Sequence, residues 1–250
     1  MKKSFYLLLM SQLFFSACFS NLSDKSDSFD VFIDEWDMLK PHQVVCSSIK
    51  DAFIFPVNWT GEDLDNFSAL PIEYFHSMST CGLLETLFEH PTNRMTGAWC
   101  VHCSNSDLPG ITMFNNRLDS NNVAVELFKR SDCFSVLASK YLSIIKEKRK
   151  SDFQIQFFEM LLASDMCMKT LDETEKVLLM AMTLERKVDE GMLSSTRYIM
   201  IAIMKSCNYN HFLNDVGEKL VEYTWGYRNI NEFEILKYSK QFLKEKNIKV

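Results

Sequence analysis

Two cysteines separated by two residues, Cys100 and Cys103, are the first candidates for chemistry in this sequence. His102 lies between them, and Trp99 directly precedes the pair. A cysteine in such a pair can have its pKa lowered until the nucleophilic thiolate forms near neutral pH. The same two sulfur atoms could instead supply two of the four ligands of a zinc ion. The spacing therefore indicates a redox centre or a metal centre, and the simpler alternatives are a plain disulfide or two idle thiols.

The surroundings of this pair do not favour redox catalysis. The W-C-x-x-C run resembles the active site of thioredoxin-fold oxidoreductases, which place it between an apolar strand and a helix. Here residues 89–98, which contain no apolar run, precede the motif, and the turn at residues 108–110 follows it. A zinc site would need two further ligands, and the near donors are Cys81, His90 and His102. Thiol–redox or zinc chemistry at this motif is therefore our alternative hypothesis, and no cofactor is expected.

The N-terminus has the layout of an export signal. Lys2 and Lys3 precede a short apolar stretch that ends in Phe15-Ser16-Ala17-Cys18. A membrane-spanning helix needs roughly 20 apolar residues, and this stretch is shorter. Small residues before a cysteine resemble the lipobox of bacterial lipoproteins, in which the thiol is acylated and becomes the new N-terminus. The resemblance implies a signal peptide over residues 1–17 and lipidation of Cys18.

Acylation of Cys18 would place the protein in the bacterial cell envelope. Each buried methylene contributes about 0.8 kcal/mol, so several chains such as palmitate on one cysteine make a lasting membrane anchor. Phe19 stands where an Asp retains some lipoproteins at the inner membrane, which favours the outer membrane. One departure is Phe15, where the lipobox usually has an aliphatic residue. The alternatives are cleavage after Ser20, which would leave a periplasmic or secreted protein, and a retained N-terminal anchor.

Composition narrows the class of partner. The net charge is −6 and becomes more negative when Lys2 and Lys3 leave with the leader. Because the one basic cluster, residues 146–150, stands at an expected helix end, nucleic acid is not favoured as a partner. We expect the membrane, through the lipid anchor, and a protein or peptide. The sequence lacks G-x-S-x-G, H-E-x-x-H and a phosphate-cradling glycine loop, so we lean away from an enzyme.

The cysteine count does not predict a disulfide framework. The chain has eight cysteines, and with Cys18 acylated an odd number is left, which cannot all pair within one chain. Cys133, Cys167 and Cys207 fall inside helical patterns, where a free cysteine usually behaves as a small buried hydrophobe.

The sequence after the leader predicts a single all-α domain over residues 31–250. A polar tether over residues 18–30 joins this domain to the lipidated Cys18. Its first part, 31–120, holds all five prolines and is rich in aromatic residues, so we expect irregular structure there. One clear helix is predicted from Thr80 to His90, because a capping residue precedes it and Pro91 ends it. Residues 93–116 read as a long loop.

The second part, 121–250, has no proline and predicts helical hairpins. Candidate helix caps recur about every twenty residues, at Asp132, Asp152, Asp172, Ser194 or Ser195, Asn210 or Asn214, and Asn231. Two such helices form a unit of about forty residues, near the HEAT and armadillo period. We therefore expect an irregular α-hairpin stack of that kind or a helical bundle. Residues 198–204 are apolar on every face, so their helix should lie in the core, and most methionines should fill it.

Two short stretches resemble uncharacterised exported proteins of gut-type bacteria. They are Ser77 to Thr80 running into His90-Pro91, and Leu127 to Asp132. The resemblance implies export and a helical domain, and it carries no activity. The sequence as a whole predicts a lipid-anchored envelope protein with a binding or scaffolding role.

Overall fold

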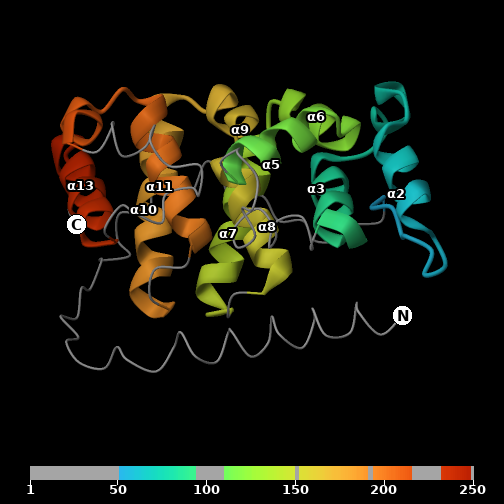
Figure 1. The fold of residues 1–250 in the computed structure, drawn as a ribbon, viewed down its shortest axis with the longest axis horizontal. Coiled ribbons are helices and arrows are strands. Elements are labelled where there is room, and N and C mark those ends of the chain that lie inside the picture. The colour runs from blue at the N-terminus through green and yellow to red at the C-terminus, as the bar shows by residue number, and fades with distance from the viewer. Residues whose placement is uncertain (1–50, 94–109, 150–151, 191–193, 216–231, 249–250) are drawn as a thin grey trace. The chain divides into compact units, whose positions relative to one another are not determined.

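The computed structural model describes residues 51–93, 110–149, 152–190, 194–215 and 232–248. The chain divides into two compact units, residues 1–30 and 31–250, and every described residue belongs to the second. Within the described ranges every regular element is a helix, which confirms the all-α prediction (Figure 1).

The described helices fall into an earlier and a later group along the chain. The earlier group is α2 (Gly61–Ser68), the 3-10 turn η2 (Ile72–Phe75), α3 (Thr80–Glu89), α5 (Gly110–Asp119) and α6 (Asn122–Lys129). The later group is α7 (Cys133–Lys146), α8 (Phe153–Ala163), α9 (Asp165–Thr170), α10 (Glu173–Glu190), α11 (Ser194–Ser206) and α13 (Glu232–Glu245). The expected helix at 80–90 is confirmed as α3.

Part of the region expected to be irregular is helical. α2 begins with a capping box, in which the Thr60 hydroxyl accepts from the Asp63 N–H at 3.2 Å and the Asp63 carboxylate accepts from the Thr60 N–H at 2.8 Å. α5 begins at Gly110, so the loop prediction for residues 93–116 is wrong for 110–116, and residues 94–109 lie outside the described ranges. The missed signal was the pair Phe114 and Leu118, four residues apart and both buried on one face.

The predicted caps of the later helices are only partly correct. Asp152 accepts from a first-turn N–H of α8 at 2.8 Å. Asp172 and Glu175 form the expected capping box at the start of α10, with N–H to carboxylate distances of 2.9 and 2.8 Å. Asp132 stands at the N-cap of α7 but caps nothing, because its carboxylate accepts from the Thr80 hydroxyl at 2.6 Å. Asp132 therefore ties α7 to the start of α3.

The later helices pack as stacked hairpins. In one row α3 packs against α7 and α7 against α10, and in the other α8 packs against α11 and α11 against α13 (Figure 1). α10 also packs against α11, which joins the rows, and α13 contacts both. Each helix thus contacts its equivalent in the next hairpin, whereas α5, α6 and the short α9 depart from this pattern.

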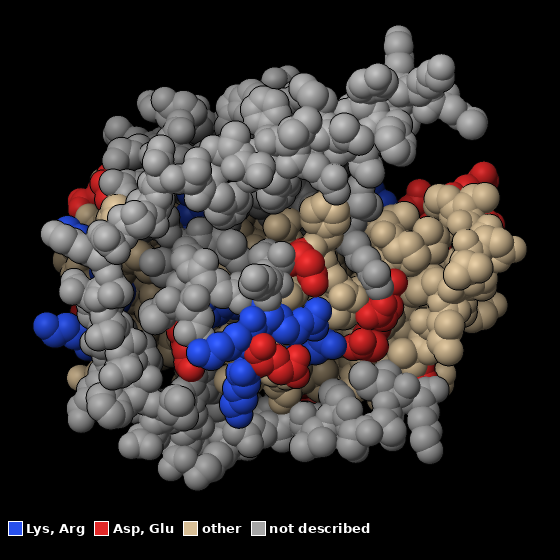
Figure 2. All heavy atoms as spheres, turned by 90° about the horizontal axis from the view of Figure 1, so that it is seen from below, with Lys and Arg blue, Asp and Glu red and all other residues tan. Residues whose placement is uncertain are grey.

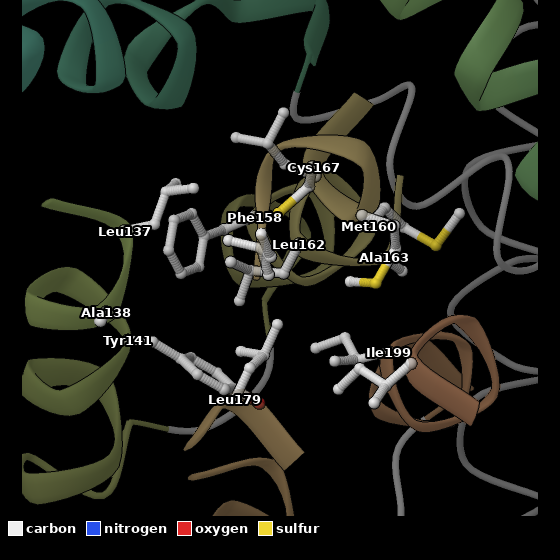
Figure 3. Packing of buried hydrophobic residues seen from close by; sticks show 14 of the residues in the cluster. Leu137, Ala138, Tyr141, Phe158, Met160, Leu162, Ala163, Cys167, Leu179 and Ile199 are labelled. Atoms are coloured by element: carbon white, nitrogen blue, oxygen red, sulfur yellow. The ribbon is translucent and has the colours of Figure 1, made fainter. Parts of the chain in front are cut away.

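The core lies between the two rows. Figure 3 shows side chains from four helices converging there: Leu137 and Tyr141 of α7, Phe158 and Leu162 of α8, Leu179 of α10, and Ile199 of α11. Within residues 198–204 of α11 only Ala202 is not fully buried, which confirms the prediction for this helix. α8 is enclosed just as completely, since every residue from Ile155 to Ala163 is buried. Six methionines also lie in the core, namely Met160, Met168, Met180, Met182, Met200 and Met204.

Candidate functional site

The residues that the sequence marks for chemistry lie outside the described ranges. These are the proposed lipidation site Cys18 and the speculative redox or metal residues Cys100, His102 and Cys103. Their roles remain predictions.

Two of the donors that a zinc site could have recruited are engaged elsewhere. Cys81, in the first turn of α3, is disulfide-bonded, so it offers no thiolate. This disulfide was not predicted. Both ring nitrogens of His90 lie beside hydroxyls, with Nε2 3.2 Å from Ser68 Oγ and Nδ1 3.0 Å from Thr92 Oγ1. In this state neither residue is a free metal ligand.

The other described cysteines are free thiols, as predicted. Burial raises the pKa of Cys133 to about 12 and also raises the pKa values of Cys167 and Cys207. A protonated, buried thiol is a poor nucleophile. Cys133 and Cys167 therefore contribute packing, not reactivity, whereas Cys207 is only half-buried.

The aromatic residues of the first part pack against one another around Phe67 of α2. The Phe67 ring centroid lies 4.3 Å from that of Phe53, 5.2 Å from Phe55, 5.9 Å from Trp59 and 5.6 Å from Phe75. Such tilted and edge-to-face pairs each contribute about 0.5–1.5 kcal/mol beyond the area they bury. These aromatics extend the hydrophobic core at the α3 end of the stack.

His90 is buried at the edge of this aromatic cluster. Its ring meets that of Phe55 edge-on, with centroids 4.7 Å apart. Burial lowers the pKa of His90 to about 4, because the surrounding rings cannot solvate an imidazolium. The imidazole is therefore neutral at pH 7, and one of its nitrogens accepts a hydrogen bond while the other donates one.

A small cleft opens beside the aromatic cluster, and we call it the Arg117 cleft. It is lined by Asn93, Phe114, Arg117, Leu118, Asn121 and Phe157. Its open space is about 220 Å³, including solvent at the mouth, and its innermost part has the size of about one water molecule. The cleft thus combines one cation and two carboxamides with two phenylalanine rings that are almost fully buried.

The two carboxamides of the cleft are held by helix ends. Asn93 donates from Nδ2 to the Leu87 carbonyl of α3 at 3.1 Å. Asn121 caps α6, because its Oδ1 accepts from the N–H groups of Val123 and Ala124 at 3.0 and 3.2 Å. Both side chains are therefore held in place within the domain.

A short hydrogen-bonded path joins the cleft to His90. Asn121 Nδ2 donates to Ser68 Oγ at 3.4 Å, and Ser68 Oγ is the group beside His90 Nε2. A substitution of Asn121 can therefore disturb the aromatic cluster through the Ser68 hydroxyl. Ser68 and His90 form a serine–histidine pair, but Thr92 occupies the place of an orienting carboxylate, which does not fit a hydrolase triad.

A second polar cluster is enclosed in the centre of the stack. Arg186 of α10 pairs with Glu159 of α8 through Nε and Oε1, and their side chains are only 2% and 0% exposed. The Ser195 hydroxyl of α11 donates to Glu159 Oε2, and Arg186 Nη1 donates to the Arg149 carbonyl at 3.0 Å. This cluster joins three helices to the end of α7.

The basic run lies at the C-terminal end of α7, as the sequence predicts. α7 ends at Lys146, and Lys148 adopts the left-handed conformation that closes many helices, with φ of 49°. Arg149 lies 3.5 Å from the carboxylate of Asp152. Figure 2, which views the molecule from below Figure 1, shows basic side chains beside acidic ones on the described part of that face. The run therefore does not form a field of one sign.

No group of three or more potential metal ligands gathers anywhere among the described residues. Within the same ranges, no helix is both long enough and apolar enough to cross a membrane. No family model matches the chain, and neither the curated proteins nor the solved structures contain a match.

Local sequence signals point to only part of the Arg117 cleft. Asn121 precedes the apolar-periodic run of α6, which is the usual place of a helix cap. Arg117 carries no local signal, because its position depends on how α5 packs against α6 and α8.

Proposed function

We propose that this protein is anchored in the bacterial cell envelope by an acylated Cys18 and that its helical domain binds a partner or serves as a scaffold. The observation that carries the proposal is the leader, with two lysines, a short apolar stretch and small residues before the cysteine. The disulfide at Cys81 supports it, because such bonds persist in oxidising compartments outside the cytosol.

The scaffold part of the proposal is supported by the hairpin stack. Helical stacks of this kind expose extended surfaces that suit proteins and peptides. That support is an analogy at the level of fold, and the partner must be argued from a site.

Mass spectrometry of the mature N-terminus tests the anchor. We expect a chain that begins at acylated Cys18, and we expect unprocessed precursor to accumulate with globomycin, a blocker of lipoprotein processing. The variant Cys18→Ser should move the protein out of the membrane fraction, whereas the matched variant Cys207→Ser, which removes a free and half-buried thiol, should not. A mature chain that begins elsewhere and carries no acyl group would remove the anchor.

The alternative proposal is a thiol–redox or zinc protein that uses Cys100, His102 and Cys103. Elemental analysis and thiol titration test it directly. If Cys100→Ser and Cys103→Ser change neither the zinc content nor the rate of thiol exchange, this alternative is excluded.

A further inference from the structure

One loop of the helical domain turns apolar side chains towards the solvent, and we call it the apolar loop. It covers residues 53–59, Phe-Ile-Phe-Pro-Val-Asn-Trp, and Figure 1 shows it in blue at the end of the stack where α2 lies. Ile54 is 89% exposed, Val57 is fully exposed, and Pro56 between them is exposed as well. Turns that face water are usually built from Gly, Pro, Asn, Asp and Ser. Neighbouring apolar side chains at such a turn indicate an interaction surface.

The inner side of the loop faces the aromatic cluster. The rings of Phe53, Phe55 and Trp59 all pack within that cluster. Side chains alternate between the two sides of an extended chain, so Ile54 must point away from the cluster that holds both of its neighbours. The exposure of Ile54 is therefore a consequence of the packing beneath it.

The backbone of the loop is held at both ends. The Phe53 N–H donates to the buried hydroxyl of Thr86, in α3, at 2.9 Å. The Trp59 N–H donates to the Pro56 carbonyl at 3.2 Å, which closes the turn that carries Val57. The apolar side chains are thus presented by a backbone that is already ordered, so a partner would not have to be bound at the cost of ordering the loop.

The charges beside the loop narrow the class of partner. Asp51 precedes the loop, and Glu62 and Asp63 follow it in the first turn of α2, and all three are exposed. A negatively charged surface would be repelled by these carboxylates. Apolar side chains, in contrast, gain free energy on leaving water whatever the charge of the surface that receives them. The loop therefore suits a partner that is apolar and carries no net negative charge.

The place of the loop in the chain favours a bilayer as that partner, and this step rests on the proposed function. Residues 19–50 separate the proposed anchor, Cys18, from Asp51, where the described part of the domain begins. The effective concentration of a tethered group falls as the linker lengthens. Among the described surfaces, the apolar loop is therefore the one that the anchor keeps most concentrated at the bilayer.

We infer that the apolar loop is a second membrane contact, at which Ile54, Pro56 and Val57 enter the interface of the bilayer that holds Cys18. The partner is the neutral lipid surface. A weak contact is sufficient, because the anchor already confines the chain to the membrane. The contact turns the α2 end of the stack towards the bilayer and leaves the remaining helices for a protein partner.

This inference and the proposed anchor fail in different measurements. If Cys18 is acylated and the loop does not touch lipid, the inference fails and the anchor stands. If Cys18 carries no acyl group, the anchor fails, and flotation of the same chain with vesicles still measures whether the loop binds them.

Photo-cross-linking of the mature chain in vesicles tests the inference. The chain is purified from the membrane fraction and reconstituted into phosphatidylcholine vesicles that include a phosphatidylcholine with a diazirine in its acyl chain. Irradiation releases N2 and leaves a carbene that inserts into a neighbouring C–H bond, and mass spectrometry of the peptides locates the adducts. We expect adducts on the peptide that carries the apolar loop as well as on the N-terminal peptide.

Two variants show whether the exposed side chains make the contact. The double variant Ile54→Ser with Val57→Ser should lower the labelling of the loop peptide by about tenfold or more, because burial of one such side chain is already worth about tenfold in a partition coefficient. Phe233→Ser is the matched control, since it removes an exposed apolar side chain of α13, at the other end of the stack in Figure 1, and it should leave that labelling unchanged. Circular dichroism checks that each variant is folded.

Lipid charge supplies a further arm. Replacing part of the phosphatidylcholine by phosphatidylglycerol should lower the labelling of the loop by up to about fivefold, because the acidic side chains beside the loop are then repelled. Added salt should restore the labelling. Labelling that rises with the anionic lipid would overturn the assignment to a neutral surface.

Two other outcomes would overturn the inference as a whole. The first is an N-terminal peptide that is labelled while the loop peptide is not. The second is equal labelling in the double variant and in Phe233→Ser. If the loop carries no lipid adduct and the double variant converts a dimer into a monomer in light scattering, then the partner of the loop is a second copy of the chain and not the membrane.

Discussion

The α3 end of the stack and its centre both bury a titratable side chain, and they satisfy it in different ways. At the α3 end the group is His90, which stays neutral between two hydroxyls and an aromatic ring. In the centre the group is Arg186, whose permanent charge is matched by the Glu159 carboxylate buried beside it. A neutral histidine needs only ordinary hydrogen bonds, whereas a buried cation requires an anion of its own.

We therefore expect the two regions to be destabilised by different changes. The α3 end should be sensitive to acid, since protons are the agent that would charge His90. The centre should be intolerant of losing either partner of the ion pair. Substitutions and pH therefore probe the two regions separately.

The largest effect is expected from breaking the central ion pair. Arg186→Met leaves the Glu159 carboxylate buried without its cation, which should lower the free energy of unfolding by about 3–5 kcal/mol in urea titrations. The double variant Glu159→Leu with Arg186→Met should recover most of this loss, because apolar replacement of a whole buried pair is often neutral.

The exposed pair of Asp65 and Arg117 supplies the control for that measurement. Arg117→Gln should cost less than about 1 kcal/mol. If Arg186→Met costs no more than Arg117→Gln, then burial does not make the central pair important, and the contrast between the regions fails.

The next effect is a loss of stability in acid that depends on His90. Its pKa falls from 6.5 in the unfolded chain to about 4 in the folded state, so the unfolded chain binds the extra proton between these values. Stability is therefore complete above about pH 6.5 and falls as the pH drops toward 4, by about 3 kcal/mol in total at 1.36 kcal/mol per pKa unit. Urea unfolding from pH 7.5 to 4 measures this slope.

Two variants isolate the contribution of His90. His90→Phe should flatten the acid slope, while His211→Gln, which removes an exposed histidine, should keep it. Asp65 and Arg117 are the charged groups that act on His90, with opposite signs, and both variants retain them. An unchanged slope in His90→Phe would show that other groups set the acid response.

The sequence predicted the helical class and the apolar helix at 198–204 because these depend on local periodicity, which a single segment carries by itself. It also predicted Asp152 and the pair Asp172 with Glu175 as caps, since a cap bonds to its own helix. The prediction for Asp132 failed because a partner distant in sequence, Thr80, takes its carboxylate.

The Arg117 cleft could not be predicted from local patterns. Its polar residues come from the segment after α3, from α5 and from the N-cap of α6, and they meet only because α5 packs against both α6 and α8. The pairing of Arg186 with Glu159 is equally non-local, since 27 positions separate them in the chain. From the sequence alone, a charged residue on a helix is expected to face solvent, because the helix that carries its partner is not known.

The smallest effect concerns how the α3 end is tied to the segment before it. The Asp51 carboxylate accepts from the Ser79 N–H and, at 3.0 Å, from the Ser79 hydroxyl, and the backbone hydrogen bond lowers the pKa of Asp51. A Cβ at Gly82 would lie 2.4 Å from Asp51 Oδ1, so Gly82→Ala must push this carboxylate away. We expect a loss of about 1 kcal/mol in the free energy of unfolding, the size of one lost cap.

Variants at Gly61 and Asp51 test whether the contact with Asp51 causes this small loss of stability. A Cβ at Gly61 meets nothing within 4 Å, so Gly61→Ala should be neutral or stabilising by up to about 1 kcal/mol. In an Asp51→Ala background the obstacle at Gly82 is gone, and Gly82→Ala should there become neutral or stabilising as well. If Gly82→Ala costs the same with and without Asp51, then the close approach of these residues does not hold the start of α3, and the α3 end depends on its aromatic cluster alone.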